Sequence, residues 1–220
     1  MKETPNGHDR RHAARSEEIV TAATEVFFEK GYGRTSMDDI IAKVGGSKRT
    51  LYSHFPGKDA LFVAIVRKIS GQALSGFQPQ LEGDFGTTLR EMGTHYLEIL
   101  LKPQTISLFR AMVSEAPHFP HLAKTFFENG PHRISSHFSE FFKLHNAKGV
   151  YRIANPELAA RQFLGMMRGD LHLAVVLTAK SPTKREIAQT IDDAIETLMK
   201  CSVERVEPKQ RKLGRRTSSV

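Results

Sequence analysis

The sequence predicts an all-α protein with a small three-helix head and a larger helical body. Apolar residues recur at three- and four-residue spacing along most of the 220 residues, which is the period of amphipathic helices. No segment shows the apolar–polar alternation of a half-buried strand. Within residues 35–58, two short helical patterns flank a Gly-Gly pair. Helices this short need a scaffold to hold them, so they are expected to pack in a helix–turn–helix arrangement.

The first helix of the head is expected over residues 16–30. The Gly-Tyr-Gly sequence at residues 31–33 ends it, because glycine adopts the left-handed backbone conformation found after many helices at little cost. One face of this helix carries the apolar residues Ile19, Ala22, Ala23, Val26 and Phe27.

The second helix begins after a capping sequence. Thr35 and Ser36 are favoured N-cap types, and an aspartate follows each of them at the three-residue spacing of a capping box. Gly45 and Gly46 then end the helix. Its buried face is expected to consist of Met37, Ile40, Ile41 and Val44.

The third helix has one apolar side and one basic, polar side. Ser47 caps it and Pro56 ends it, since proline lacks the amide hydrogen that continues a helix. Leu51 and Phe55 are four residues apart and anchor one face in a core. All charged residues of segment 40–58 are basic, namely Lys43, Lys48, Arg49 and Lys58. Such a face suits the phosphate backbone of DNA, although an ordinary helical corner also carries a solvated basic face.

Residues 16–66 resemble the N-terminal domain of the TetR family of bacterial transcriptional regulators. The residues that carry the resemblance are Ile19, Ala22, Ala23, Phe27, Gly31, Tyr32, Thr35, Ser36, Ile40, Val44, Gly45, Ser47, Thr50, Leu51, Tyr52, Phe55 and Lys58. Members of that family are all-helical homodimers with a DNA-binding head and a ligand-binding body. The resemblance therefore implies that the third helix enters the major groove of a double-stranded DNA operator.

The same resemblance implies a set of DNA-contacting residues. They are Thr35, Ser36, Ser47, Lys48, Arg49, Thr50, Tyr52, His54 and Lys58. Two positions depart from the family pattern: Ile41 stands where alanine is common, and Gly46 where valine is common. These departures leave the operator sequence open.

The body is expected to begin near residues 71–86, where glycine, proline, glutamine and serine accumulate. Residues 107–131 and 157–173 resemble the C-terminal domain of the AefR-like branch of TetR regulators. The expected domains are thus a head of residues 16–66 and a ligand-binding and dimerisation body of residues 67–203. The helices expected after the head are 58–69, 87–101, 104–115, 122–129, 131–147, 156–179 and 183–203.

The two ends of the chain are basic and polar. The chain carries a formal net charge of +8, and segment 203–220 contributes six basic residues against two acidic ones. Residues 1–15 and 204–220 are expected to be disordered. Arg10, Arg11 and Arg15 would then form an arm that reaches a neighbouring minor groove, or simply a solvated tail.

A ligand pocket is expected among the body helices that are rich in methionine and phenylalanine. Such residues line adaptable apolar cavities, although at helical spacing they equally form plain core. The expected effector is a small apolar or amphipathic molecule. The candidate residues are Met92, His95, Tyr96, Phe109, Met112, Val113, Phe127, Phe138, Met166, Met167 and Asp170, with Phe126 and His172 near them.

The last two helices are expected to form the interface of a homodimer. Residues 171–177 are apolar almost all round, so this segment needs cover on two sides, either from a second chain or from a thicker core of its own. A dimer supplies the two-fold symmetry that two operator half-sites require. The candidate residues are Phe163, Met167, Leu171, Ala174, Val175, Ile187, Ile191, Ile195 and Leu198.

Other classes of protein are less compatible with this sequence. The single cysteine, Cys201, excludes an internal disulfide and fits the reducing cytoplasm. No apolar run is long enough to span a membrane, and the motifs of common enzyme classes are absent. No cofactor is expected, and the histidines around residues 118–137 lack the spacing of a metal site.

The expected function is that of a ligand-responsive transcriptional repressor. As a dimer it would bind a palindromic or pseudo-palindromic operator, and a small-molecule effector would release it. Two alternatives stay open at this point. One is an activator or global regulator with the same head and no effector, and the other is a helical small-molecule binding protein that does not act on DNA.

Overall fold

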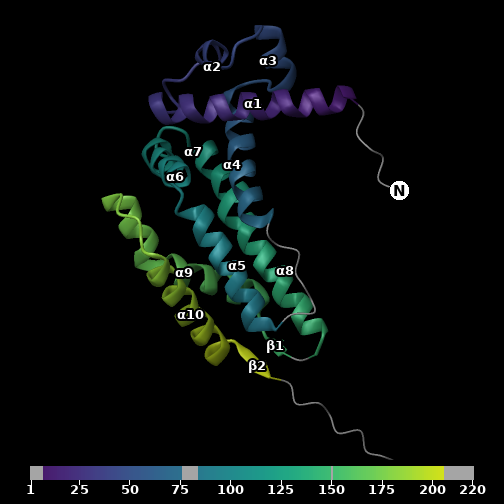
Figure 1. Ribbon diagram of the computed structural model, residues 1–220, viewed down its shortest axis with the longest axis vertical. Coiled ribbons are helices and arrows are strands. Elements are labelled where there is room, and N and C mark those ends of the chain that lie inside the picture. Colours follow the sequence, from purple (N-terminus) through teal and green to yellow (C-terminus); the bar gives the residue numbers. More distant parts are fainter. Residues whose placement is uncertain (1–6, 76–83, 150, 206–220) are drawn as a thin grey trace, which may run out of the picture.

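The computed structural model describes residues 7–75, 84–149 and 151–205, and it confirms the all-α class with a helix–turn–helix head. The head lies at one end of an elongated molecule (Figure 1). A single helix, α4 (Lys58–Ser75), runs from the head into the body. The head itself is built from α1 (Gly7–Lys30), α2 (Met37–Val44) and α3 (Lys48–His54).

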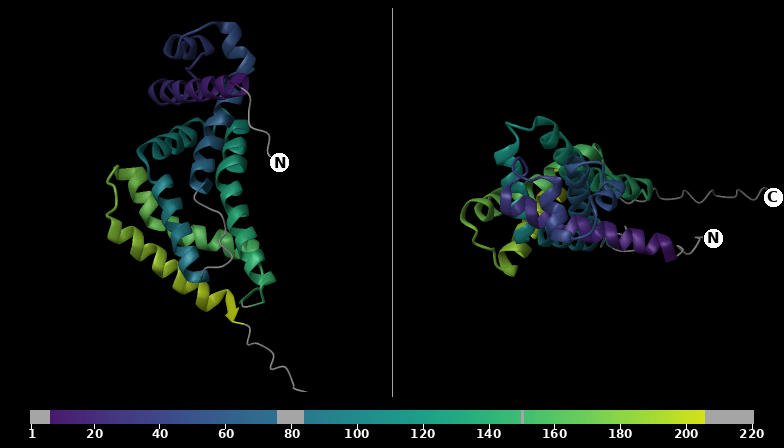
Figure 2. Two further views of the ribbon diagram at one scale, coloured as in Figure 1. Left: turned by 45° about the vertical axis from the view of Figure 1, so that its right-hand side comes forward. Right: turned by 90° about the horizontal axis from the view of Figure 1, so that it is seen from above.

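The body is a helical bundle in which α5 and α8 lie beside α4, while α9 and α10 pack together along one flank (Figures 1 and 2). A short antiparallel pair, β1 (Tyr151–Ile153) with β2 (Val203–Arg205), lies at the end away from the head. The helices are α5 (Phe85–Leu100), α6 (Pro103–Glu115), α7 (Pro120–Phe127), the π-helical turn η1 (Glu128–His132), α8 (Arg133–Ala147), α9 (Pro156–Thr178) and α10 (Lys184–Cys201).

One apolar cluster joins the head to the body. Leu108 and Met112 of α6 and Leu122 of α7 are buried in the same cluster as the core residues of the head. The head therefore rests on α6 and α7 as well as on α4. We call this set the head cluster: Ile19, Val20, Ala23, Val26, Phe27, Tyr32, Ile40, Leu51, Phe55, Leu61, Phe62, Ile65, Val66, Leu108, Met112 and Leu122.

Phenylalanines dominate the second cluster, which forms the core of the body. The ring centroids of Phe85 and Phe141 are 5.5 Å apart, and those of Phe141 and Phe142 are 5.8 Å apart. Phe138 packs against Phe163 with a centroid distance of 5.8 Å. All five side chains are less than 2% exposed, so they contribute much of the apolar area that the body buries.

The first helix begins at Gly7, and the prediction of a disordered arm is wrong for residues 7–15. Alanine is the best helix former, and Ala13 and Ala14 lie in this stretch. Asp9 adds a favourable charge in the first turn. Residues 1–6, and residues 206–220 of the predicted tail, lie outside the described residues, whereas 204 and 205 belong to β2.

Two local features escaped the sequence analysis. The strands β1 and β2 span three residues each, which is too short to give a recognisable alternation. In α9, Gly169 has non-helical backbone angles (φ 27°, ψ −137°) and breaks the helix. The positive φ explains why a glycine stands at the break.

The helix expected to end at residue 69 continues to Ser75, and residues 76–83 lie outside the described residues.

The packing of the body generates a stability prediction for Phe142, which is fully buried among other phenylalanines. A Phe142→Ala variant leaves a cavity and should lose roughly 3–5 kcal/mol of unfolding free energy. Denaturant unfolding at matched protein concentration measures this loss. Leu144→Ala on the same helix is the control, because Leu144 is 38% exposed and its truncation should cost less than about 1 kcal/mol. Equal losses in both variants would contradict the described core.

Candidate nucleic-acid interface and ligand cavity

Helix α3 is positioned by its two ends and by two buried side chains. The Ser47 hydroxyl accepts a hydrogen bond from the Thr50 amide at 3.1 Å and so caps the helix. Leu51 and Phe55 are buried in the head cluster, at 2% and 8% exposure. Because these two residues fix one face of α3 against the head, the orientation of its other side chains is fixed too.

The exposed surface of α3 carries cationic and hydroxyl groups. Arg49 is exposed, and Tyr52 is 49% exposed. The Lys48 ammonium forms an ion pair with the Asp38 carboxylate of α2 at 2.8 Å. This pair raises the pKa of Lys48, so the side chain is a cation. Asp38 lies just outside the acid-free segment 40–58, and the sequence analysis did not anticipate that it partly neutralises this surface.

Three of the nine predicted DNA-contacting residues form contacts within the head. Thr35 is 3% exposed, and its hydroxyl donates a hydrogen bond to the Gly31 carbonyl at 2.8 Å. The Lys58 ammonium donates to the carbonyls of Tyr32 at 3.1 Å and Thr35 at 3.2 Å. It also lies 4.5 Å from the centre of the Tyr32 ring. Lys58 thus holds the loop between α1 and α2 in place, and its predicted phosphate contact stays a prediction. The burial of Thr35 corrects the contact predicted for that residue.

The third is His54, which is half-buried and stacks on His12 of α1 with ring centroids 4.0 Å apart. Its Nδ1 atom is buried without a hydrogen-bond partner in the described part of the chain. Burial, and then the neighbouring His12 and Arg15, lower the pKa of His54 below its ordinary value. The remaining predicted contacts, Ser36 and Ser47, are exposed, and Thr50 is half-buried.

The first turns of α1 contact the turn before α3. The Arg15 guanidinium donates to the Gly45 carbonyl and to the Glu18 carboxylate, the latter at 2.7 Å. A Cβ atom at Gly46 would lie 2.8 Å from Nη2 of Arg15, and φ at Gly46 is +97°. The positive φ gives a physical reason for glycine at a position where the family commonly has valine, since the flexible Arg15 side chain could move away from a Cβ atom. Arg10 and Arg11 are exposed on the same extension of α1.

The loop between α1 and α2 also contacts the body. Tyr32 donates a hydrogen bond to the Asp59 carboxylate, and burial together with Asp59 raises the pKa of Tyr32. Its ring packs edge-on against Phe119, which precedes α7, at 5.2 Å. The Glu115 carboxylate of α6 accepts a hydrogen bond from the Gly33 amide at 3.3 Å. We call these residues, Tyr32, Gly33, Asp59, Glu115 and Phe119, the head–body junction.

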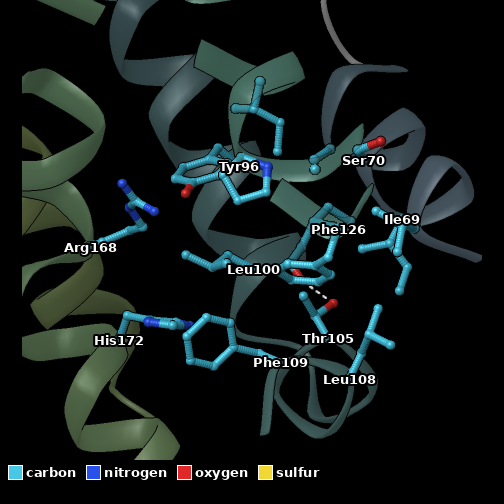
Figure 3. A pocket seen from close by; sticks show the side chains of 16 residues that line it. Ile69, Ser70, Tyr96, Leu100, Thr105, Leu108, Phe109, Phe126, Arg168 and His172 are labelled. Carbon is cyan, nitrogen blue, oxygen red and sulfur yellow. Dashed lines mark hydrogen bonds between the residues drawn. The ribbon is translucent and has the colours of Figure 1, made fainter. Parts of the chain in front are cut away.

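A cavity lies in the body directly beneath the head cluster. Its empty volume is about 630 Å³, including the part open to solvent. It is bounded by side chains from α4 to α9, and Figure 3 shows them converging on one space. The walls are mainly apolar, with Val66, Ile69, Leu100, Leu108, Phe109 and Phe126 among them. Five side chains are polar, namely Ser70, Tyr96, Thr105, Arg168 and His172.

The cavity contains only part of the predicted pocket. Tyr96 and Phe109 line it, as do Phe126 and His172. Other candidates are elsewhere because neighbouring residues on a helix face different sides. Met92, Phe138 and Met167 belong to the body core, and Met112 to the head cluster. The remaining candidates also lie outside the lining: Val113, Phe127 and Asp170 are exposed, and His95 and Met166 are half-buried.

Arg168 is the charged residue of the cavity, and it was not among the residues that the sequence analysis proposed. It is the charged residue within the otherwise apolar and small-residue segment 163–169 of α9, and that isolation was the available signal. Four residues of α4 also line the cavity and were not among the candidates: Val66, Ile69, Ser70 and Ala73.

Most of the predicted dimer-interface residues are buried within their own chain. Phe163, Met167, Val175, Ile191, Ile195 and Leu198 are at most 8% exposed, so the prediction is corrected for these six. Leu171 and Ile187 are half-buried, and Ala174 is exposed. The exposed apolar side chains of α9 are Leu158 (41%), Leu173 (52%) and Leu177 (73%). Ile191, Ile195 and Leu198 belong to the core of the body, so the apolar stripe that the sequence shows on α10 faces inward.

The described residues contain neither a metal-binding cluster nor a helix suited to a membrane. No group of three or more histidine, cysteine, aspartate or glutamate side chains among them is arranged to hold a metal ion. His121, one of the histidines considered earlier, lies 3.3 Å from the Asp59 carboxylate. Within the same residues, no helix combines the length and apolar character needed to cross a membrane.

Comparisons with known proteins agree with this geometry. Residues 19–65 match the model for bacterial regulatory proteins of the tetR family, and residues 87–201 match the model for the C-terminal domain of AefR-like transcriptional repressors. The second match alone covers just over half of the chain.

Solved structures are similar over most of their length. The flavonoid-responsive regulator FrrA is 31% identical, with a TM-score of 0.73 over 86% of this chain and 96% of that one. A TetR family regulator from Pseudomonas syringae pv. tomato is 25% identical, with a TM-score of 0.66 over 84% and 95%. The curated activator FasR of Mycolicibacterium smegmatis is 36% identical over 64 residues, which are 29% of each chain. The first three curated matches span 29–35% of the relatives' lengths.

The environment of His54 generates a prediction about pH. Burial, His12 and Arg15 all oppose protonation of this imidazole. As the pH falls through about 6.5, the unfolded chain therefore takes up a proton that the folded head resists, and folding stability should decline. An NMR titration should place the His54 midpoint below the ordinary histidine value, and His12→Ala should move it upward. A midpoint at or above the ordinary value would show that the stacked arrangement is not formed.

Proposed function

Because the chain belongs to the TetR family of bacterial regulatory proteins, we propose that it is a ligand-responsive transcriptional regulator, and specifically a repressor. As a homodimer it binds a palindromic or pseudo-palindromic operator through α3, and a small apolar or amphipathic effector in the cavity releases it. The observation that carries this proposal is that Leu51 and Phe55 hold α3 against the head while Arg49 and Tyr52 remain exposed.

The proposed contacts divide into two kinds. Helix α3 enters the major groove, where the planar guanidinium of Arg49 suits a guanine edge or a phosphate. The hydroxyl groups of Tyr52, Ser47 and Thr50 suit phosphate oxygens. Lys48 exchanges the Asp38 carboxylate for a phosphate, so that binding releases counterions and depends on salt. The exposed Arg10 and Arg11 of α1 extend the basic surface toward flanking DNA.

The proposed domains follow from the two apolar clusters. We assign residues 16–66, with the preceding turns of α1 from Gly7, to the DNA-binding head, and residues 67–203 to the ligand-binding and dimerisation body. The boundary falls within α4, because Leu61 and Ile65 belong to the head cluster and Ala73 to the body core. A continuous helix across a domain boundary is a direct route for mechanical coupling.

The proposed dimer interface uses the exposed leucines of α9. Leu158, Leu173 and Leu177 present apolar area to solvent in the single chain, and side chains of this kind mark association surfaces. Leu171, Ala174 and Ile187 are the predicted interface residues that remain accessible at least in part. A two-fold axis there brings two copies of α3 to one side of the dimer, as two half-sites require.

Release by an effector requires that cavity and head share structural elements. Val66 lines the cavity and belongs to the head cluster, and so does Leu108 of α6. At the end of α6, Glu115 accepts the hydrogen bond from Gly33 in the head–body junction. An effector that displaces α4 or α6 therefore changes the support of the head, and effector and DNA affinities are reciprocally coupled.

Repression is favoured over activation because the matched C-terminal model describes AefR-like repressors. Activation by the same head is the second candidate, since FasR is named an activator. FrrA is named flavonoid-responsive, and a small, flat aromatic effector is compatible with walls that include Phe109 and Phe126. The proposal assigns no catalytic activity or cofactor and places the protein in the cytoplasm, where bacterial DNA lies.

The proposal predicts that the outer side chains of α3 determine operator affinity. The DNA segment upstream of the gene is the first target to test, by fluorescence anisotropy at fixed salt. Arg49→Ala should cost roughly 1–3 kcal/mol of binding free energy, and Tyr52→Phe about 0.5–1.5 kcal/mol. Arg152→Ala is the control, because Arg152 is an exposed cation on β1, away from the head. Unchanged affinity in both α3 variants, with specific binding in the parent, would refute the α3 assignment.

The proposed interface predicts a change of oligomeric state. Leu173→Asp combined with Leu177→Asp places two charges in the apolar surface and should convert the dimer to a monomer in sedimentation velocity. Operator affinity should fall with it, because each monomer contacts one half-site only. Leu144→Asp tests the effect of a charge at an exposed leucine of α8 and should leave the dimer intact. A double variant that remains dimeric would place the interface elsewhere.

A further inference from the structure

The cavity is charged at one end only. Arg168 reaches from α9 toward the hydroxyl group of Tyr96, with His172 four residues further along α9, as Figure 3 shows. On the other side the polar side chains are Ser70 and Thr105, whose hydroxyl groups donate to the carbonyls of Arg67 and Ile99. A ligand that fills this space therefore meets a charge at a single place.

The guanidinium of Arg168 has no acidic partner among the described residues. Its Nε donates to the Leu164 carbonyl at 3.2 Å, within its own helix. The ion pairs of the described chain do not include Arg168. The terminal guanidinium nitrogens thus bring a full positive charge and several N–H donors to the cavity without a carboxylate to balance them.

Tyr96 and His172 do not supply the missing negative charge. Burial raises the pKa of Tyr96 to about 12, against the opposing effect of Arg168, so its hydroxyl stays protonated. Burial, and then Arg168, lower the pKa of His172, so its imidazole is neutral at neutral pH. Nε2 of His172 is buried without a hydrogen-bond partner in the described chain. This end of the cavity is therefore a cationic site surrounded by neutral hydrogen-bonding groups.

We propose that the cavity selects a small apolar molecule bearing one oxyanion, a carboxylate or an ionised phenol, which pairs with Arg168 and accepts a hydrogen bond from the Tyr96 hydroxyl. This inference rests on the proposed function, in which the same cavity is the effector site. A ligand that fills the cavity displaces the water that solvates Arg168, and a buried charge left without a partner is costly. A planar guanidinium pairs with a carboxylate through two parallel hydrogen bonds, which repays that cost.

The remainder of the ligand has to match the apolar walls. The rings of Phe109 and Phe126 lie 6.3 Å apart with an interplanar angle of 55°. Phe109 also packs edge-on against His172 at 5.0 Å, close to the charged end. An aromatic or compact aliphatic body next to the oxyanion fits this arrangement of apolar walls.

The test compares matched ligands that differ in charge. Calorimetric titration of the full chain with 2-naphthoate and with its neutral analogue 2-naphthamide should show at least about tenfold tighter binding of the acid. Ionised 4-nitrophenol and neutral 4-nitroanisole, compared in mildly alkaline buffer, form the phenolate arm. Tighter binding of either anion than of its neutral analogue supports the inference and identifies the kind of oxyanion. Equal binding within both pairs, or no binding of either anion, overturns it.

Variants of Arg168 localise the effect. Arg168→Met keeps the length of the side chain without its charge and should weaken binding of the preferred anion roughly tenfold or more, while the neutral analogue binds as well or better. Arg168→Lys keeps the charge and should retain part of the preference. Arg161→Met, at an exposed position of α9 outside the cavity, should behave as the parent. An unchanged preference for the anion in folded Arg168→Met overturns the assignment to Arg168. If that variant unfolds, partial or complete loss of the preference in folded Arg168→Lys, beside an unchanged preference in Arg161→Met, supports the assignment. Full retention of the preference in Arg168→Lys overturns it.

The design separates this inference from the proposed function, because these titrations contain no DNA. An anion that binds through Arg168 but leaves operator affinity unchanged supports the ligand class and counts against the effector role. Release of the operator by neutral aromatic compounds alone supports the effector role and overturns the ligand class.

Discussion

The position of α3 depends on an apolar cluster that the head shares with the body. A helix of seven residues is too short to be stable in isolation. Leu51 and Phe55 attach it to α1 and α4, and the same cluster continues into α6 and α7 through Leu108, Met112 and Leu122. A displacement of α6 therefore changes the packing around the residues that support α3. In the proposed function, this continuity is the route by which a ligand in the cavity changes the support of α3.

Polar contacts at and beside the head–body junction hold the loop between α1 and α2 in one position on the shared cluster. Lys58 satisfies carbonyl groups of the loop between α1 and α2, and Tyr32 in that loop donates to Asp59 at the start of α4. From the other side, Glu115 accepts from Gly33. Apolar packing alone permits sliding, whereas the part-buried hydrogen bonds of Tyr32 and Lys58 are costly to break without replacement. The hydrogen bond between Gly33 and Glu115 is exposed and contributes less. The loop is thus fastened to both α4 and α6, the two helices that also line the cavity.

The sequence contained enough information to predict the head and its outward-facing helix. The spacing of Leu51 and Phe55, the glycine pair before Ser47 and the proline after the helix are local signals, and local signals determine short helices well. The roles of Thr35 and Lys58 were not predictable in this way. Lys58 contacts carbonyls more than twenty residues earlier in the chain, and its position at the start of a helix suggested an outward-facing cation. The cavity was predicted only in part, because Phe126 and Phe127 are adjacent in sequence but only Phe126 lines it. The break at Gly169 was not predicted either, because a single glycine within an apolar helical pattern does not by itself indicate a break.

Leu108 offers the most direct test of the shared cluster, because it lies in the body and yet supports the head. Operator affinity should be measured for Leu108→Ala beside Leu144→Ala, with circular dichroism to verify that both variants are folded. If the body supports α3 through this cluster, Leu108→Ala weakens operator binding although it removes no group near DNA, and Leu144→Ala does not. Equal and undiminished affinity in a folded Leu108→Ala variant would show that the head is positioned independently of the body.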